Sequence, residues 1–368
     1  MMIELHMLKS FPPVNLNRDE SGSPKSCFFG GSQRGRISSQ SLKHSWRSDS
    51  EIQKLPLGVR TRRLADLISD RLAKDGISKE AIAAIAPRLS GFGNKDAKES
   101  EDGLTSQIMF FSQADLDAIT DILKNLVSGK EIAEIKKIKV GDLKDALSSF
   151  TRPITADMAL FGRMITDAAF KDVEASLQVA HAISTHVVNM ESDFFTAVDD
   201  LQKLYGADGG SAMMGDTDFN SCTYYFYASL DVDQLLLNLD GMENREEVVL
   251  KLLPGLISAM VFSNPSGKQN TFAGHSLPGL VCAQLKERKV PVSHANAFEK
   301  PVRGREGFMA PSIRALKEHM DVTDKSFGLP VVSRLWFAPG CEAAPQHSKV
   351  MDTLPQLMDE VKTWLKEG

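Results

Sequence analysis

The residues best suited to chemistry are five cations that lie between positions 30 and 47, where no carboxylate occurs. They are Arg34, Arg36, Lys43, His44 (when protonated) and Arg47. Residues two apart in an extended segment point to the same side, which pairs Arg34 with Arg36. Residues four apart on a helix share a face, which pairs Lys43 with Arg47. The whole chain carries a net charge of -5, so a cluster of cations without local carboxylates stands out. Such a cluster predicts a partner that bears phosphate groups.

Hydroxyl and backbone N–H groups add to this anion-binding pattern. Ser38 or Ser39 is expected to cap a helix that begins near Gln40, and the free N–H groups at a helix start attract anions. Gly30 and Gly31 let the backbone approach a ligand closely. The glycine-rich motifs of nucleoside triphosphate and dinucleotide sites are missing, so neither ligand has support. A solvated basic surface paired with local acids is the competing interpretation.

A second cationic cluster occurs late in the chain. Its members stand among prolines and glycines, which predicts a loop: Lys300, Arg303 and Arg305. Loop cations beside glycines hold phosphates without reading the base sequence. An ordinary surface loop is the alternative.

Several apolar side chains could contact a base. Met164 follows Arg163 at the end of an expected strand, and Phe194 and Phe195 precede an acidic, glycine-rich segment. Met213 and Met214 end that segment. An exposed Met or Phe can wedge against a base or stack on it, although a Met is more often part of a core.

The search for catalytic groups gives two candidates for RNA cleavage. His44 could act as an acid–base group, although a surface role is the simpler interpretation. Asp19 and Glu20 could hold a metal, but adjacent acids point to different sides. His181 and His186 lie near no nucleophile motif. The four cysteines are far apart and form no CxxC pair, so we expect reduced thiols, no metal and no cofactor.

Composition bounds the class of protein. The chain has 368 residues, of which 42% are hydrophobic, and its start lacks the pattern of a signal peptide, so we expect a cytoplasmic globular protein. Residues 1–63 hold 11 Lys or Arg and 5 Asp or Glu, a net charge of +6. Residues 191–247 hold 2 Lys or Arg and 13 Asp or Glu, a net charge of -11. This asymmetry suits a chain that binds a polyanion with one face or copies of itself head to tail.

Hydrophobic periodicity predicts the elements that position these residues. Strands are expected at 3–8, 34–38, 155–165, 179–188, 222–230, 279–288 and 331–339. Helices are expected from about 40, within 60–148, and at 231–239, 245–262, 310–320 and 354–368. Residues 9–33 are expected to form a loop because they are rich in Pro, Asn, Ser and Gly. The order predicts an α+β fold with helices on one face of a sheet and a large helical insertion.

Together these segments resemble the CasC family of the RAMP superfamily, the backbone subunit of the type I-E CRISPR surveillance complex called Cascade. The matching segments are LNRDE (16–20), FFGGSQRGRISSQSLKHSWR (28–47), GRM (162–164), HAISTHVV (181–188), FFTAVDDLQ (194–202) and ANAFEKPVRGREGF with PSI (295–313). They follow the family's order across nearly the whole chain. Residues 60–150 match only in type and length.

The resemblance implies a right-hand fold. An RRM-like (ferredoxin-like) palm is expected at 1–59, 151–188 and 223–368, helical fingers at 60–150, and a β-hairpin thumb at 189–222. It also implies a non-catalytic protein, several copies of which (typically six) line up head to tail along a CRISPR RNA. Other Cascade subunits would join them, and the guide bases would stay exposed for pairing with target DNA.

The resemblance further implies a set of RNA-binding residues. These are Arg18, Lys25, Arg34, Arg36, Ser38, Gln40, Lys43, Arg47, Arg163, Met164, Phe195, Lys300, Arg303 and Arg305. Most are expected at the RNA backbone, whereas Met164 and Phe195 are expected to pack at a displaced base. The alternative is a RAMP-type endoribonuclease that processes CRISPR RNA or cleaves target RNA, with His44 or Asp19 in the reaction.

Overall fold

The computed structural model describes residues 1–94, 96, 98–149, 152–165, 167–197, 213–305, 307–329, 331–341 and 343–367. The chain forms two compact units, each built from segments that are distant in sequence. Unit 1 contains residues 1–52, 178–231 and 250–368, and unit 2 contains residues 53–177 and 232–249. The fold is α+β, as predicted, with a large mixed sheet.

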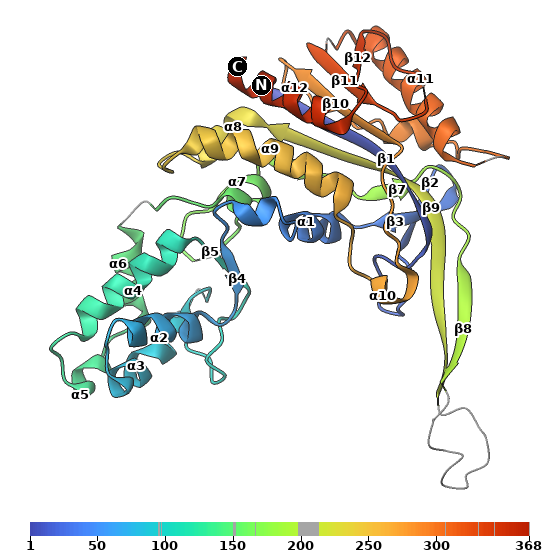
Figure 1. The fold of residues 1–368 in the computed structure, drawn as a ribbon. Helices are drawn as coiled ribbons and strands as arrows, with labels where there is room; N and C mark the ends of the chain where they lie inside the picture. Colours follow the sequence, from blue (N-terminus) through green and yellow to red (C-terminus); the bar gives the residue numbers. More distant parts are fainter. Residues whose placement is uncertain are drawn as a thin grey trace, which may run out of the picture. The chain divides into compact units, whose positions relative to one another are not determined.

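Unit 1 is built on a sheet whose strand order is β12-β11-β10-β1-β9-β7-β3-β2, with β6 and β8 also paired to β9 (Figure 1). Its strands are β1 (Met2–Val14), β2 (Ser26–Phe29), β3 (Ser32–Ile37), β6 (Leu177–Val179), β7 (Ala182–Ser184), β8 (Glu191–Ala197), β9 (Met213–Asp231), β10 (Leu280–Lys286), β11 (Ser333–Phe337) and β12 (Ser348–Val350). Its helices are α1 (Ser39–Arg47), α9 (Arg245–Phe262, which begins in unit 2), α10 (Gln269–Phe272), the short η3 (Ala295–Phe298), α11 (Met309–Phe327) and α12 (Leu354–Glu367).

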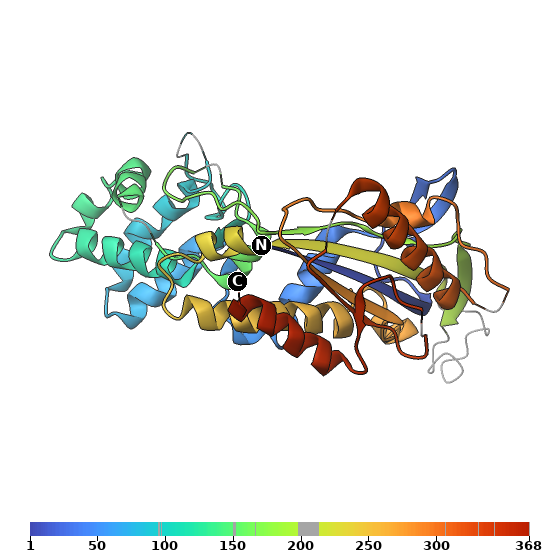
Figure 2. The ribbon, with the colours of Figure 1, turned by 90° about the horizontal axis from the view of Figure 1, so that it is seen from above.

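Helices cover both faces of this sheet, not one face as predicted. On one face, Leu8 and Trp336 pack with Ile313 and Leu316 of α11. Alternate residues of a strand point to opposite faces, so the completely buried Leu335 faces away from α11. Helices α9 and α12 run along that second side (Figures 1 and 2). The sequence pattern predicts these helices but does not say which face of a sheet each of them covers.

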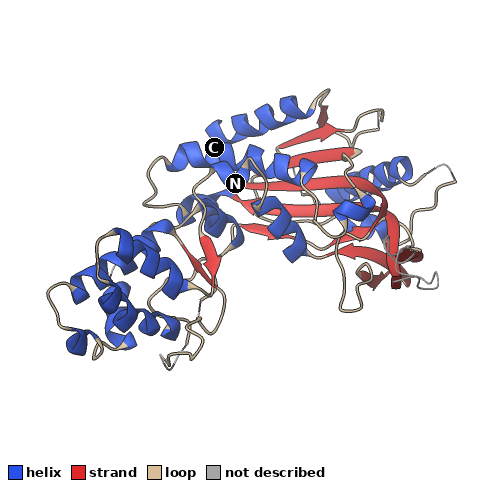
Figure 3. Cartoon of the chain, turned by 60° about the horizontal axis from the view of Figure 1, so that its bottom comes forward, coloured by secondary structure: helices blue, strands red, loops and turns tan. Residues whose placement is uncertain are grey.

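Unit 2 is mostly helical (Figure 3). Its elements are η1 (Ile52–Lys54, at the boundary), β4 (Val59–Thr61), α2 (Leu64–Lys74), α3 (Lys79–Ile85), η2 (Ala86–Gly91), β5 (Met109–Phe111), α4 (Gln113–Val127), α5 (Ile132–Ile135), α6 (Val140–Ser148), α7 (Ala156–Phe161) and α8 (Val232–Asn238). Leu64, Ile68, Leu116 and Ile119 contribute to its core, together with Phe170. The apolar residues recur at helical spacing, as predicted for 60–148.

Two predictions about elements were wrong, and the single strand expected at 179–188 is instead the end of β6 (Leu177–Val179) and the short β7 (Ala182–Ser184). Residues 155–165 form helix α7 and a turn instead of a strand, because Ala, Met and Leu favour a helix and the Asp157 carboxylate accepts the N–H of Met158 in its first turn. Residues 9–33 are not one loop, because β1 continues to Val14 and β2 and β3 lie within or begin in that range. The exposed Pro12 and Pro13 fit at the end of β1 because the pairing register shifts there.

Candidate nucleic-acid interface

Arg34 lies at the centre of the cationic region but inside the protein. Its side chain is fully buried, and its guanidinium donates to the carbonyl oxygens of Ser184 (3.0 Å), Phe298 (2.8 Å) and Glu299 (3.0 Å). The first acceptor belongs to β7, and the other two belong to the segment directly before Lys300, in the second cationic cluster. Arg34 therefore joins two parts of the interface, and the structure gives it a positioning role in place of the expected contact with RNA.

Gly30 completes this junction at the β2–β3 turn. A Cβ atom at position 30 would lie 1.8 Å from the carbonyl oxygen of Glu299, and the residue has a φ of +56°. Only a glycine satisfies both conditions. The expected close backbone approach at Gly30 is real, but its partner is another segment of this chain.

Arg36, on the accessible part of β3, forms a polar cluster with Lys25 and His181. The N–H of Arg36 donates to the carbonyl oxygen of Lys25 (2.9 Å), and the Arg36 guanidinium lies 3.0 Å from Nδ1 of His181. Partial burial lowers the pKa of His181, and the charges of Arg36 and Lys25 lower it further. His181 is therefore neutral near pH 7 and accepts the Arg36 hydrogen bond.

Helix α1 begins where β3 ends. Of the two predicted cap candidates, Ser38 is the N-cap, and Ser38 Oγ accepts the N–H of Ser41. Leu42 and Trp46 are buried. The exposed or half-buried side chains of the helix include Gln40, Lys43, His44 and Arg47. Burial also lowers the pKa of Lys43.

The loop before β2 is held against this helix by Asn17. Its side-chain oxygen accepts the N–H of Ser38 (2.9 Å), and its carbonyl oxygen accepts the N–H of Lys25 (2.8 Å). Arg18 is exposed beside it and lines a hollow with Lys25. Sequence reasoning missed this role of Asn17, because the bond joins residues 21 apart and no local pattern signals it.

Asp19 has a structural role in the same loop. Its Oδ1 accepts the N–H and the hydroxyl of Ser21 (2.9 and 2.7 Å) and the N–H of Ser23 (3.1 Å). These bonds lower the pKa of the Asp19 carboxyl. Within the described ranges, no group of three or more His, Cys, Asp or Glu side chains is placed to hold a metal ion.

The second cationic cluster packs beside the first one. Val302 donates its N–H to the carbonyl oxygen of Thr185 (2.9 Å), directly after β7. Lys300, Arg303 and Arg305 are exposed on this loop. The prediction that these cations stand in a loop is confirmed.

The two clusters form a row along β3. The 300–305 loop lies beside the start of β3 and the residues that follow β7. Arg36 pairs with Ile183 near the end of β3, and Ser38 then caps α1. Arg34 and Arg36 point to the same face, and Arg34 holds the loop there. With a rise of ~3.4 Å per residue, six residues of β3 span roughly 20 Å. The row suits several consecutive phosphates of an extended strand.

The long β8–β9 hairpin carries exposed apolar and acidic residues. The Phe195 ring lies over Gly215. A Cβ atom at position 215 would lie only 2.8 Å from that ring. Phe194 and Met214 lie on the opposite face, because Phe194 pairs with Asp216 and Thr196 pairs with Met214. Residues 198–212 of the expected thumb are outside the described residues.

In unit 2, Arg163 and Met164 have opposite environments. Arg163 is buried, and its guanidinium donates to Asp115 (2.6 Å) and to the carbonyl oxygen of Lys171. The Met164 side chain is 94% exposed. Arg163 thus fixes the turn that presents Met164, and the expected RNA contact is not available to its own guanidinium.

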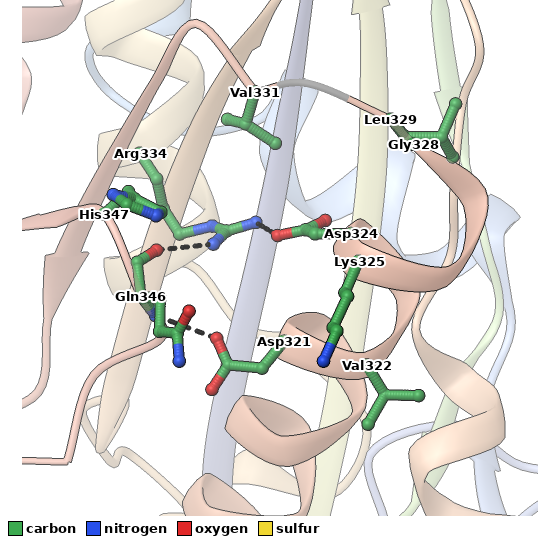
Figure 4. A pocket seen from close by; sticks show the side chains of 10 residues that line it. All are labelled: Asp321, Val322, Asp324, Lys325, Gly328, Leu329, Val331, Arg334, Gln346 and His347. Atoms are coloured by element: carbon green, nitrogen blue, oxygen red, sulfur yellow. Dashed lines mark hydrogen bonds and ion pairs between the residues drawn. The ribbon is translucent and has the colours of Figure 1, made fainter.

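A separate hollow of about 780 Å³ lies at the end of α11 (Figure 4). Its acids are already engaged: Asp324 pairs with Arg334 (2.6 Å), and Asp321 accepts the N–H of Gln346 (2.8 Å). This arrangement is a structural ion network and supplies no free acid–base pair. Within the described part of the chain, no helix has the length and apolar character needed to cross a membrane.

Comparisons with known proteins agree with the motifs. Residues 3–364 match the model of a family described as CT1975-like protein. A solved chain of a "CRISPR RNA-guided surveillance complex, pre-nicking" has a TM-score of 0.85 and 28% identity, covering 99% of this chain and 100% of that one. A second, from a "CRISPR RNA-guided surveillance complex", has a TM-score of 0.71 and 22% identity with the same coverage and shows the fold alone. No curated sequence matches. The chain therefore belongs to the CT1975-like family, the CasC-like family of CRISPR-associated proteins that its motifs indicated.

Proposed function

We propose that this protein is a non-catalytic CRISPR RNA-binding subunit that oligomerises along the guide of a type I-E Cascade complex. The observation that carries the proposal is the row of cations along β3, which Arg34 assembles from segments about 265 residues apart. Phosphate contacts carry no base information, so such a row suits a protein that must accept any guide sequence. The whole-length likeness to a surveillance-complex chain supports the same role.

The proposed partners follow from this role. They are the CRISPR RNA, the target DNA strand, neighbouring copies of this chain (typically six in the family), and other Cascade subunits. The acids of the β8–β9 hairpin, which include Glu191, Asp193 and Asp216, suit contact with a basic surface of a neighbouring copy. One copy makes few phosphate contacts, so binding gains strength from many linked copies.

The right-hand description remains part of the proposal. In it, the unit 1 sheet is an RRM-like palm, residues 60–150 are the fingers, and the hairpin within 189–222 is the thumb. Met164 and Phe195 pack at the displaced base. Their exposure supports this, since both side chains keep a solvent-accessible surface.

RNA cleavage is the alternative function, and two observations weigh against it. One oxygen of the Asp19 carboxylate, Oδ1, already accepts hydrogen bonds from Ser21 and Ser23. His44 is exposed on α1, where a surface role is the simpler interpretation. The alternative requires RNA cleavage that is lost in His44→Ala or Asp19→Ala.

The test is size-exclusion chromatography with light scattering on the protein co-expressed with its partner proteins and a CRISPR RNA. Wild type should elute as a large RNA-containing assembly, and Lys43→Glu/Arg47→Glu should not. Lys362→Glu/Lys366→Glu is the matched control, because these lysines are also four apart on a helix of unit 1. An RNA-free monomer in both wild type and the Lys43/Arg47 variant would refute the proposal.

A further inference from the structure

A hollow of about 360 Å³ opens at the loop end of the cationic row. Its lining combines two cations, Lys300 and Arg303, with an aromatic ring, Phe308, and an amide, Asn189. This volume lies in the range of small-molecule sites, about 300–1,000 Å³. The rest of the row is a line of cations along a strand, so the hollow differs from it in both shape and chemistry.

The aromatic wall of the hollow is a rigid ring pair. The His186 and Phe308 rings are nearly parallel (13°), with centroids 3.7 Å apart. The Thr223 N–H donates to His186 Nε2 (3.1 Å), so Nδ1 carries the proton and donates to the carbonyl oxygen of Val187 (2.9 Å). Burial lowers the pKa of His186. The pair is therefore a neutral, fixed platform rather than an acid–base group.

The cationic wall is also held in place. Val302 and Ser312 both bond to Thr185, through its carbonyl oxygen (2.9 Å) and its hydroxyl (2.8 Å). Gly304 lies so close to Gly307 that a Cβ would stand 2.0 Å from the Gly307 carbonyl oxygen. This tight fold keeps Lys300 and Arg303 at the rim while their side chains remain exposed.

We infer that this hollow binds one nucleotide of the RNA, with its base against Phe308 and its phosphate at Lys300 and Arg303. The inference rests on the proposed function and adds a base-binding site to an interface that otherwise contacts phosphates. Aromatic stacking accepts every base because each has a π-face. The hollow should therefore require a base without selecting its identity, as a guide-binding protein needs.

The experiment places 2-aminopurine at successive single positions of the guide in the reconstituted complex. In wild type, a subset of positions should be quenched by stacking. Phe308→Leu should remove that quenching, Phe308→Tyr should keep it, and Phe327→Ala, an exposed Phe at the other end of α11, should leave it unchanged. Circular dichroism identifies the variants that fold. Lys300→Ala/Arg303→Ala leaves the ring pair in place but removes the two cations, so it should weaken the quenching.

A second arm measures RNA affinity with an abasic site at a quenched position. The abasic site should weaken wild-type binding by about 5- to 150-fold, the range expected for one stacked base, and should weaken folded Phe308→Leu by much less. Equal quenching in wild type and Phe308→Leu, with RNA bound, would overturn the inference and leave the proposed function intact. Failure of wild type to bind RNA at all would overturn both.

Discussion

The salt dependence of RNA binding tests whether α1 faces phosphates. Eight side chains of the interface keep an exposed or half-buried cation: Arg18, Lys25, Arg36, Lys43, Arg47, Lys300, Arg303 and Arg305. Each phosphate neutralised on a single strand contributes about 0.7 to the slope of log K against log salt concentration. If each cation neutralises one phosphate, the wild-type slope is about -5.6 per copy, and Lys43→Ala/Arg47→Ala should reduce it to about -4.2.

These slopes correspond to measurable affinity changes. Between 50 and 200 mM salt, wild type should lose about 2,000-fold in affinity and the double variant about 300-fold. Fluorescence anisotropy with a labelled single-stranded RNA measures both curves. Lys362→Ala/Lys366→Ala on α12 should keep the wild-type slope. A Lys43→Ala/Arg47→Ala protein that folds and keeps the wild-type slope would refute the placement of these two cations at the RNA backbone.

Three further changes probe the buried groups, each by urea unfolding unless stated otherwise. Arg34→Lys keeps the charge but loses the fork that bonds three carbonyl oxygens, so it should cost about 1–3 kcal/mol and weaken RNA binding in the anisotropy assay. Asp115→Asn leaves the buried Arg163 without its counter-charge and should cost about 3–5 kcal/mol, whereas Met164→Ala should stay within ~0.5 kcal/mol. The free energy of unfolding should fall as the pH drops below about 6.5, because burial lowers the pKa of His294 to about 3 and the unfolded chain therefore binds the proton first. This group contributes up to ~1.4 kcal/mol per pH unit, and His294→Gln should reduce the acid slope by that amount.

The sequence was most informative where one local pattern decides the structure. The period of apolar residues predicted α9 with the bounds that the structure shows, and the aromatic and β-branched run 222–230 lies within β9. The cap of α1 was narrowed to Ser38 or Ser39 because a serine directly before a helical pattern is a typical cap, and the structure selects Ser38. Each of these signals depends on neighbours within a few residues, which a sequence displays directly.

Sequence reasoning failed where distant segments decide. Arg34 and Arg36 have the same charge and lie two residues apart on one strand, so the sequence treats them alike. Only Arg34 is buried, because residues 298 and 299 cover it. The same holds for Arg163, whose counter-charge, Asp115, is 48 residues away. The charge pattern predicted an accessible position for Arg34, and the family resemblance implied an RNA contact for Arg163. Only the tertiary fold shows that both arginines are internal.

The buried positions of Arg34 and His186 bear on the choice between binding and cleavage. Arg34 uses its guanidinium to hold two segments together. Under the proposed function its contribution to RNA binding is therefore geometric and should persist at high salt. His186 uses both ring nitrogens for backbone bonds, so it neither gives nor takes a proton during a reaction. Central charged and titratable groups that are fixed in this way suit the proposed function, in which the interface holds a bound strand in a constant shape. Cleavage would need a group free to exchange a proton at the RNA, and His186 is not such a group because both of its ring nitrogens are engaged.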